Sequence, residues 1–326
     1  MIVSARRQVR PQERVVYLFC LWALTVTLVT ACGGRPKNQE PPRHVEADRL
    51  AGKGSRWFRQ GCFEKAERYF YRALEASLLV DDLEGMARAR NNLGAVALAQ
   101  GHYLEAGEHL QKALVINSEV KSTREQSLTL GNLGSLAYKA ERYREAEQFW
   151  EKALVVAQND AEQAGLAMHL NNMGMLRLRQ GRLPEAESLI QRAIARAEQG
   201  GSGSTLANSH VQLGLVARAR GDLAEAEEQM NLALEIDKAA ENTVGIAQDL
   251  ELLGLLHQQQ QFWNQAAHEL DRSIHLYATL GKTEKVDEIY GFLKTNQAGG
   301  GVPESLEPYE ALLVPPDEFW QSPLCR

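Results

Sequence analysis

Side chains that commonly perform catalysis or bind metals are present in this sequence, but they are not spaced for either task. The eight histidines include no His-Glu-x-x-His pattern, and Cys62 and Cys325 form no Cys-x-x-Cys pair. The glycine-rich segment 200–203 follows a predicted helix and lacks the lysine of a phosphate-binding loop, so it is interpreted as a connector. Asp81 and Asp82 stand where a helix is predicted to start, so helix capping explains them without a metal ion. We therefore predict no catalytic residue, no metal site and no cofactor.

Composition and charge limit the classes of function. Of the 326 residues 44% are apolar, enough for a substantial core, which excludes disorder throughout. The formal charge is −6, and because the first 31 residues contain four Arg and one Glu, the remainder has a charge of −9. An acidic protein of this kind lacks the clustered Lys and Arg that nucleic acids and anionic lipid surfaces require. We expect neither as a main ligand.

The N-terminus has the three parts of an export signal. Arginines at positions 6, 7, 10 and 14 precede an uncharged run over residues 15–30, and small residues follow before a cysteine. This run of about 16 residues is short for a membrane-spanning helix, which needs roughly 20. Residues 1–31 are therefore predicted to be a signal peptide. The alternative is an uncleaved signal anchor.

The segment Val29-Thr30-Ala31-Cys32 resembles a bacterial lipobox. The resemblance implies a lipoprotein, in which the nucleophilic thiol of Cys32 receives a diacylglycerol and palmitate, and the polypeptide is cut before it. Gly33 stands where lipoproteins retained at the inner membrane carry Asp, so the implied location is the outer membrane of a bacterial cell envelope, facing the periplasm. The polar, Pro-rich residues 32–44 are predicted to be a flexible linker.

Two further cysteines, Cys62 and Cys325, remain outside the signal peptide and the lipidation site. The periplasm permits disulfides, and the segment 297–325 could reach about 95 Å if extended at ~3.3 Å per residue. Pairing is possible, but nothing in the sequence supports it. The favoured interpretation is a half-buried thiol at Cys62 and an exposed thiol in a loose tail.

A 40-residue repeat runs through most of the sequence. Six similar segments begin at residues 61, 101, 141, 181, 221 and 261, and each follows a second recurring string, which is weaker ahead of the first segment. Apolar residues in both strings have helical spacing, so each unit is predicted to be two amphipathic helices joined by a turn. The six segments are GCFEKAERYFYRAL, GHYLEAGEHLQKAL, ERYREAEQFWEKAL, GRLPEAESLIQRAI, GDLAEAEEQMNLAL and QFWNQAAHELDRSI.

Small residues at fixed places predict close helix packing. A glycine recurs inside the first helix, where it costs roughly 1 kcal/mol relative to alanine, so we expect a neighbouring backbone too close for a side chain. A recurring alanine is predicted to make a similar close contact at the start of the second helix, and a large apolar residue to fill the layer between units. These positions are Gly94, Gly134, Gly174 and Gly214, then Ala66, Ala106, Ala146, Ala186, Ala226 and Ala266, then Phe70, Leu110, Trp150, Ile190, Met230 and Leu270.

The turns between paired helices carry their own signal. Gly61, Gly101, Gly181 and Gly221 stand where the first helix ends, a place that favours a left-handed residue. Glu141 and Gln261 replace this glycine in two repeats. Those two turns are expected to be strained or differently closed.

The pattern resembles the tetratricopeptide repeat (TPR) family, in the 40-to-42-residue form of kinesin light chains and regulatory scaffold proteins. The resemblance covers about residues 45–295 and implies an all-α fold, a right-handed superhelical solenoid of six TPR helix pairs plus a C-terminal capping helix. Residues 296–326 are predicted to be a disordered tail with an apolar cluster, from Glu310, that could dock. The expected units are about 45–82, 83–121, 122–161, 162–201, 202–241 and 242–281, with the cap at 282–295.

The resemblance also implies a binding groove. In this family the first helices line a concave surface, where an Asn before the Leu-Gly pair often hydrogen-bonds the backbone of an extended peptide, since a carboxamide both donates and accepts. Leu252 breaks the series, so binding is expected at the second to fourth units. The alternative is that the asparagines only bridge adjacent helices. The implied groove residues are Asn91, Asn92, Asn132, Asn171, Asn172 and Gln212, with Arg88, Lys139 and Arg179 nearby.

These patterns together predict a membrane-tethered scaffold for protein–protein interaction and not an enzyme. The expected partner is a protein, or an extended peptide segment of one, held in the concave groove, while the lipid anchor binds the membrane. Within this class we favour an assembly or pilotin-like factor for a pilus or secretion machine. The alternative is a general periplasmic scaffold that recruits cell-envelope enzymes. No oligomeric state is predicted.

Overall fold

The computed structural model describes residues 43–160, 163–300, 306–313 and 325. This part of the protein is helical, with one short 3-10 turn and no strand. The predicted signal peptide, Cys32 and the linker up to Pro42 lie outside the described residues. Among the helices that are described, none combines the length and the apolar character that crossing a membrane would require.

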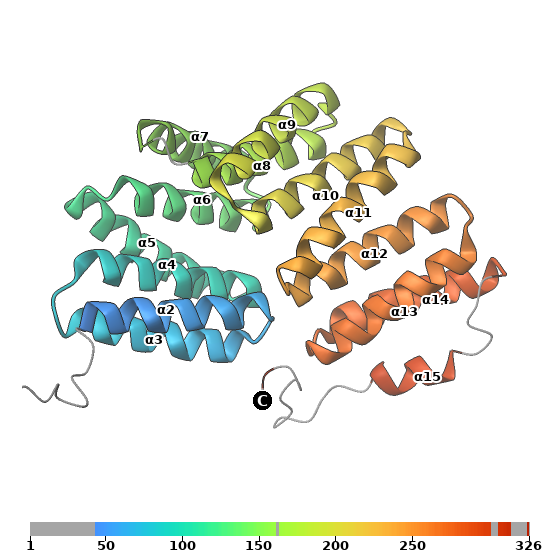
Figure 1. Ribbon diagram of the computed structural model, residues 1–326, viewed down its shortest axis with the longest axis horizontal. Helices are drawn as coiled ribbons and strands as arrows, with labels where there is room; N and C mark the ends of the chain where they lie inside the picture. Colours follow the sequence, from blue (N-terminus) through green and yellow to red (C-terminus); the bar gives the residue numbers. More distant parts are fainter. Residues whose placement is uncertain (1–42, 161–162, 301–305, 314–324, 326) are drawn as a thin grey trace, which may run out of the picture. The chain divides into compact units, whose positions relative to one another are not determined.

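The helices form six consecutive pairs followed by a single helix (Figure 1). The two helices of a pair pack closely, each pair packs on the next, and most first helices also contact the first helix of the neighbouring pair. The predicted all-α solenoid with a C-terminal capping helix is confirmed. The pairs are α2 (Arg43–Arg59) with α3 (Phe63–Leu78), α4 (Leu83–Gln100) with α5 (Tyr103–Val120), α6 (Thr123–Lys139) with α7 (Tyr143–Asp160), α8 (Gln163–Arg179) with α9 (Leu183–Gly200), α10 (Gly203–Arg220) with α11 (Leu223–Ala239), and α12 (Thr243–Gln259) with α13 (Trp263–Thr279); α14 (Thr283–Ala298) follows.

Within each pair, a glycine of the first helix lies against a large side chain sixteen residues later. A Cβ atom at Gly174 would lie 2.5 Å from Cγ1 of Ile190, and one at Gly254 would lie 2.7 Å from Cγ of Leu270. The same Cβ atom at Gly174 would lie 3.3 Å from the carbonyl oxygen of Ala186, so the neighbouring backbone is close as well. The predicted close approach is confirmed, but its nearest atoms belong to a side chain. The other pairs are Gly54–Phe70, Gly94–Leu110, Gly134–Trp150 and Gly214–Met230.

The remaining packing positions also behave as predicted. The six alanines that open the second helices are completely buried, and the six large apolar residues are buried between units. Three starts among the described helices are capped by an Asp or Asn side chain; at one of them the Asp82 carboxylate accepts a 3.0 Å bond from the amide of Gly85, and Asp222 and Asn242 act in the same way. Each repeat thus combines the same close contacts with the same apolar layer.

The turn residues share one backbone conformation whether or not they are glycine. Gly101 has φ of 82°, while Glu141 and Gln261 have φ of 59° and 63° in the same left-handed region. The amide of Arg142 donates to the carbonyl of Ala137 at 2.8 Å, as the equivalent atoms do at Gly101. These two turns are therefore strained rather than differently closed, since a side chain disfavours this region.

The first turn of the array lies against its last repeat. A Cβ atom at Gly61 would lie 2.5 Å from Cδ2 of Leu280 and 3.1 Å from Cγ2 of Val244. The Nζ atom of Lys282 lies 4.6 Å from the centre of the Phe63 ring, within range of a cation–π contact. The repeats therefore turn back on themselves, and residues more than 180 positions apart become neighbours.

A disulfide joins the first turn of the array to Cys325, near the C-terminal end of the sequence. Cys62, buried in the first turn, is bonded to Cys325, which lies 263 positions later in the sequence, and their Cα atoms are 5.4 Å apart. The structure shows pairing, so the favoured interpretation of two unpaired thiols is wrong. A cross-link that closes so long a loop strongly restricts the unfolded state, an effect on the order of 4 kcal/mol.

The predicted disorder of the tail is wrong for residues 306–313. Helix α14 continues to Ala298, and α15 (Glu307–Glu310) and the 3-10 turn η1 (Ala311–Leu313) lie against the last repeat. Tyr309 is only 5% exposed, and its hydroxyl donates a 2.8 Å bond to Oδ1 of Asp271. A buried ring with a satisfied hydroxyl explains why this segment is ordered.

The glycine contact predicts opposite effects for two glycine-to-alanine substitutions. Gly174→Ala should lower the melting temperature, because overpacking against Ile190 costs about 1–3 kcal/mol and helix propensity returns only about 1 kcal/mol. Gly291→Ala is the matched control in α14, where nothing lies within 4 Å of the added Cβ, and it should raise the melting temperature slightly. Thermal melts followed by circular dichroism measure both. Equal shifts for the two variants would contradict this account of the contact.

Candidate functional site

The inner surface of the array encloses a cavity of about 840 Å³, which we call the central cavity. Its wall comes from α2, α3, α4, α6, α8, α10, α11, α12 and α14, so every repeat contributes at least one residue. A volume of this size matches pockets that bind small molecules or short peptide segments. It is the main candidate site in the described residues.

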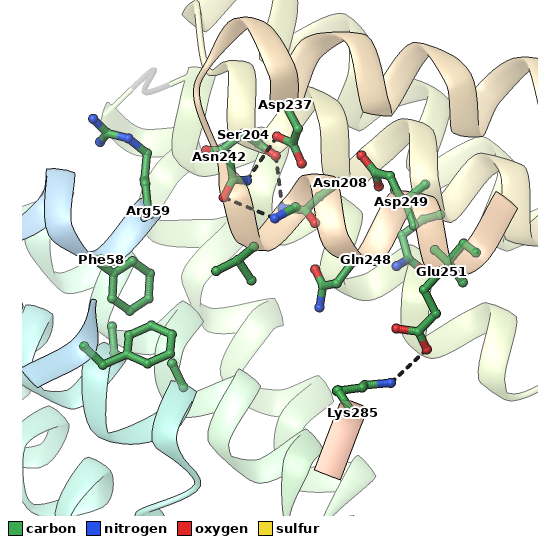
Figure 2. Close-up of a pocket in the computed structure, with 18 of the residues that line it drawn as sticks. Phe58, Arg59, Ser204, Asn208, Asp237, Asn242, Gln248, Asp249, Glu251 and Lys285 are labelled. Atoms are coloured by element: carbon green, nitrogen blue, oxygen red, sulfur yellow. Dashed lines mark hydrogen bonds and ion pairs between the residues drawn. The ribbon is translucent and has the colours of Figure 1, made fainter. Parts of the chain in front are cut away.

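The wall of the central cavity has an apolar side and a polar side. Phe58, Phe63 and Phe70 of the first repeat contribute aromatic surface, whereas the fifth and sixth repeats contribute amides, among them Asn208 and Gln248. Figure 2 shows the ring of Phe58 across the open space from these two amides. A ligand with apolar groups on one side and hydrogen-bonding groups on the other fits this arrangement.

Three of the groove residues predicted from the sequence meet in this wall. Asn92 of α4, Lys139 of α6 and Gln212 of α10 all line the central cavity. Asn92 and Gln212 are half-buried, and Lys139 is exposed. Two carboxamides and one ammonium group are therefore available to a ligand from three different repeats.

The other predicted amides do not line the central cavity. The Nδ2 atom of Asn132 donates a 2.9 Å bond to Oδ1 of Asn91, which joins α6 to α4. Asn91 and Asn171 are buried, and Asn172 is half-buried but does not line the central cavity. The alternative role of bridging adjacent helices is therefore the one observed for Asn91 and Asn132.

The two predicted arginines are engaged away from the cavity wall. A guanidinium nitrogen of Arg88 lies 3.1 Å from Oδ1 of Asp48, which links α4 to α2. The Arg179 guanidinium lies 4.7 Å from the centre of the Tyr143 ring. Neither of the two lines the central cavity.

Sequence reasoning missed two carboxylic acids in the wall, Asp237 of α11 and Asp249 of α12, which we call the acidic pair. They are 5% and 2% exposed, and Figure 2 shows their carboxyl groups turned toward each other. Asn242 donates a 3.1 Å bond from Nδ2 to Oδ1 of Asp237. The Oδ2 atom of Asp249 is buried without a hydrogen-bond partner.

Comparison of the repeats reveals the signal that could have identified the acidic pair. Three repeats earlier the same two positions are Asn117 and Thr129, both buried, with Nδ2 of Asn117 donating a 3.1 Å bond to Oγ1 of Thr129. The corresponding residues of the other units up to the fifth are not ionisable, except for a buried histidine. Two acids at positions that are buried in every one of these repeats stand out against this background. In the other units the residues at these two positions are Ser77 with Ala89, Ala157 with His169 and Ala197 with Ser209.

The surroundings of the acidic pair favour protonation. Burial, and then the nearby charge of Asp237, raise the pKa of Asp249 to about 8. Burial also raises the pKa of Asp237, although the hydrogen bond from Asn242 acts in the opposite direction. With no positive charge bonded to it, the pair retains a proton on Asp249 near neutral pH, because two buried carboxylates repel each other.

Two buried histidines belong to the packing between repeats. Nε2 of His169 lies 2.8 Å from Oγ of Ser127, and burial lowers the pKa of His169 to about 4. His257 also loses solvation by burial, but its hydrogen bond with Glu269 and the nearby charges of Glu269 and Glu227 outweigh this and raise its pKa. Neither histidine lines the central cavity.

Comparisons with known proteins agree with this architecture. A family model described as Tetratricopeptide repeat matches residues 58–119 and 125–199, and a second model with the same description matches residues 171–241. Together the two models match more than half of the sequence. No curated protein sequence matches it.

Several solved structures have a similar fold at low sequence identity. The Rap conjugation gene regulator of plasmid pLS20, in complex with the Phr* peptide, has a TM-score of 0.63 and 16% identity, covering 81% of this protein and 70% of that one. A Rap protein complexed with the competence and sporulation factor has a TM-score of 0.56 and 16% identity, covering 80% and 75%. A signal transduction ATPase from Pyrococcus horikoshii with a tetratricopeptide repeat sensor has a TM-score of 0.57 and 12% identity, covering 76% and 37%. These identities show the fold alone.

The acidic pair predicts a specific pH dependence of stability. Because the pKa of Asp249 is higher in the folded state than in the unfolded state, the stabilising proton is lost as the pH rises through about 8. The melting temperature of the wild type should therefore fall between pH 6 and pH 9, and Asp249→Asn should reduce this fall by at least about 3 °C. Asp287→Asn, at an exposed position in α14, serves as the control and should keep the wild-type slope. Parallel slopes for all three proteins would contradict the prediction.

Proposed function

Because the chain belongs to the tetratricopeptide repeat family, we propose that it is a membrane-tethered interaction scaffold that holds an extended segment of a partner protein in its central cavity. Proteins of this family are scaffolds for protein–protein interaction. The observation that carries the proposal is the position of Asn92 and Gln212 in one cavity wall. No enzymatic activity is part of the proposal.

The chemistry of the cavity wall supports a peptide as the ligand. A carboxamide pairs with a backbone N–H and with a backbone carbonyl alike, so it binds an extended peptide whatever its side chains are. The aromatic surface opposite provides contacts for apolar side chains. Because the wall draws on several repeats, the affinity would be a sum of similar small contributions.

Two proteins of similar fold offer further support. The Rap regulator of plasmid pLS20 was crystallised with the Phr* peptide, and another Rap protein with the competence and sporulation factor. A peptide-binding site on the inner surface of its helical array would give the present protein a comparable function. At 16% identity the likeness extends to the fold, so no residue is transferred from either protein.

The membrane tether is proposed from the sequence. Cys32 in its lipobox-like segment lies outside the described residues, and Gly33 favours the outer membrane. A lipid on Cys32, followed by the linker, would hold the repeat array near the periplasmic side of that membrane. The partner would then be a protein of the cell envelope.

For the cellular process we favour an assembly or pilotin-like factor for a pilus or secretion machine. A general periplasmic scaffold that recruits cell-envelope enzymes is the second candidate. Affinity purification of the full-length protein from detergent-solubilised membranes separates the two. Co-purified pilus or secretin components support the first, and cell-wall enzymes support the second.

Lipidation makes the first prediction for this function. Cys32→Ala should abolish labelling with palmitate and release the protein from the membrane fraction, because no other thiol occupies the lipobox-like position. Cys20→Ala, a change within the predicted signal peptide, is the control and should keep both properties. A Cys32→Ala protein that still sediments with membranes would identify an uncleaved signal anchor.

The cavity amides make the second prediction. Replacing both Asn92 and Gln212 with Ala should weaken the binding of the co-purified partner about tenfold, since each amide contributes roughly 0.5–1.5 kcal/mol of hydrogen bonding. Helicity should stay near the wild-type value, because neither amide has a hydrogen bond that supports the fold among the described residues. A titration of purified partner, followed by fluorescence anisotropy, measures the effect.

The matched control is Asn132→Ala, which removes the bond to Asn91 instead. This variant should lower the melting temperature and leave the affinity nearly unchanged. If the double variant of the cavity binds its partner as tightly as the wild type does, the cavity is not the binding site.

A further inference from the structure

The acidic pair is the feature of the central cavity that the protein's own contacts do not explain. In the part of the sequence that the structure describes, Asp237 and Asp249 take part in no ion pair with Lys, Arg or His. Their one side-chain hydrogen bond comes from the neutral amide of Asn242. Burying two acids in this way is costly unless something supplies donors or positive charge.

We propose that the acidic pair binds a positively charged side chain, arginine or lysine, of the peptide segment held in the central cavity. This inference rests on the proposed function and specifies its ligand. It names one residue type that the partner segment must carry. It also places the main contact with the ligand in the fifth and sixth repeats, whereas the sequence predicted binding at the second to fourth units.

The free acceptor positions of the pair match such a group. The Oδ2 atom of Asp249 is buried, belongs to a residue of the cavity wall and has no hydrogen-bond partner. An ionised carboxylate has about four acceptor sites, and the bond from Asn242 occupies one of those on Asp237. A guanidinium with five N–H donors, or an ammonium with three, would occupy several of the remaining sites and offset one of the two negative charges.

Two of the three positive groups in the cavity wall, Lys285 and Arg59, are directed away from the acidic pair, and among the described residues the third, Lys139, forms no ion pair with either acid. The Nζ atom of Lys285 lies 2.8 Å from Oε1 of Glu251 and 2.7 Å from Oε2 of Glu288. Tyr277 of α13 donates a 2.7 Å bond to the same Glu251 carboxylate, so this further acid of the wall is already satisfied. In Figure 2 the guanidinium of Arg59 points away from the acidic pair. A cation from the ligand is therefore the available partner.

The neighbours of the acidic pair suit the rest of a peptide. Asn208 and Gln248 are exposed amides in the same wall, one on α10 and one on α12 (Figure 2). Helices α10 and α12 pack less closely against each other than the other pairs of neighbouring first helices do. This leaves space in the cavity wall in the direction of Asp237 on α11. A peptide backbone lying along these amides could direct one long basic side chain between the helices to the pair.

Binding of a cation is coupled to a proton. In the free protein, burial and the charge of Asp237 hold a proton on Asp249, whose pKa is raised to about 8. When the cation arrives, the O–H bond of Asp249 breaks, its proton leaves to the buffer and two carboxylates face one bound positive charge. Near neutral pH, association should therefore release up to one proton, and above pH 9 it should release almost none.

A positional library tests the inference with a defined probe. The full-length protein, purified in detergent, is incubated with acetylated and amidated heptapeptides in which every position is varied, and the retained peptides are identified by mass spectrometry. We expect Arg or Lys to be enriched at one position. In a retained peptide, replacing that residue with uncharged citrulline or norleucine should weaken binding about tenfold or more.

Asp237→Asn combined with Asp249→Thr is the decisive variant. It reproduces the neutral pair Asn117–Thr129, which the same fold already accommodates at the equivalent positions. The variant should still retain peptides, without preference for a basic residue and without proton release, as measured by calorimetry in buffers of different ionisation enthalpy. Glu228→Gln, which removes an exposed acid of α11, should leave the preference unchanged.

The possible failures are distinguishable. If the wild type retains peptides without enrichment of Arg or Lys, or if the double variant keeps the enrichment, this inference is overturned and the proposed function stands. If the wild type retains no peptide from the library, peptide binding by the central cavity is itself contradicted.

Discussion

The whole structure depends on one steric contact, in which a helix glycine meets a large side chain sixteen residues later. The larger residue covers the glycine, so the paired helices lie close together and the carbonyl of a buried alanine completes the contact. The larger residue varies among Phe, Leu, Trp, Ile and Met, because each fills the same layer. Repetition of this contact at a constant spacing of 40 residues turns a local constraint into a regular array.

The regular array then creates contacts that no single repeat encodes. A small change in direction at each repeat accumulates until the first turn reaches the last repeat, where Gly61 lies against Leu280 and Cys62 is bonded to Cys325. The inner surface thereby becomes a cavity with residues from every unit in its wall. The docked segment around Tyr309 covers apolar surface of the last repeat, where no further unit follows.

Within this framework, equivalent positions in different repeats can serve different purposes. Asn117 and Thr129 satisfy each other and support packing, whereas Asp237 and Asp249 occupy the same places and leave an acceptor unsatisfied. The asparagines divide in a similar manner, since Asn132 bonds Asn91 while Asn92 faces the cavity. A constant backbone thus tolerates substitutions that are costly for stability, provided that the close contacts remain.

The sequence by itself determined the features that arise from local spacing. The helix pairs, their turns, the buried alanines and the capping helix all follow from periodic patterns, because their contacts lie within one repeat or between neighbours. It also predicted that Asn92, Lys139 and Gln212 share a groove, but it ranked Asn132 and Asn172 equally with them. Only the tertiary structure decided which amides face the cavity and whether Cys62 and Cys325 pair. Those outcomes depend on the accumulated curvature of the array, which brings residues from distant repeats together and leaves no mark in any single one.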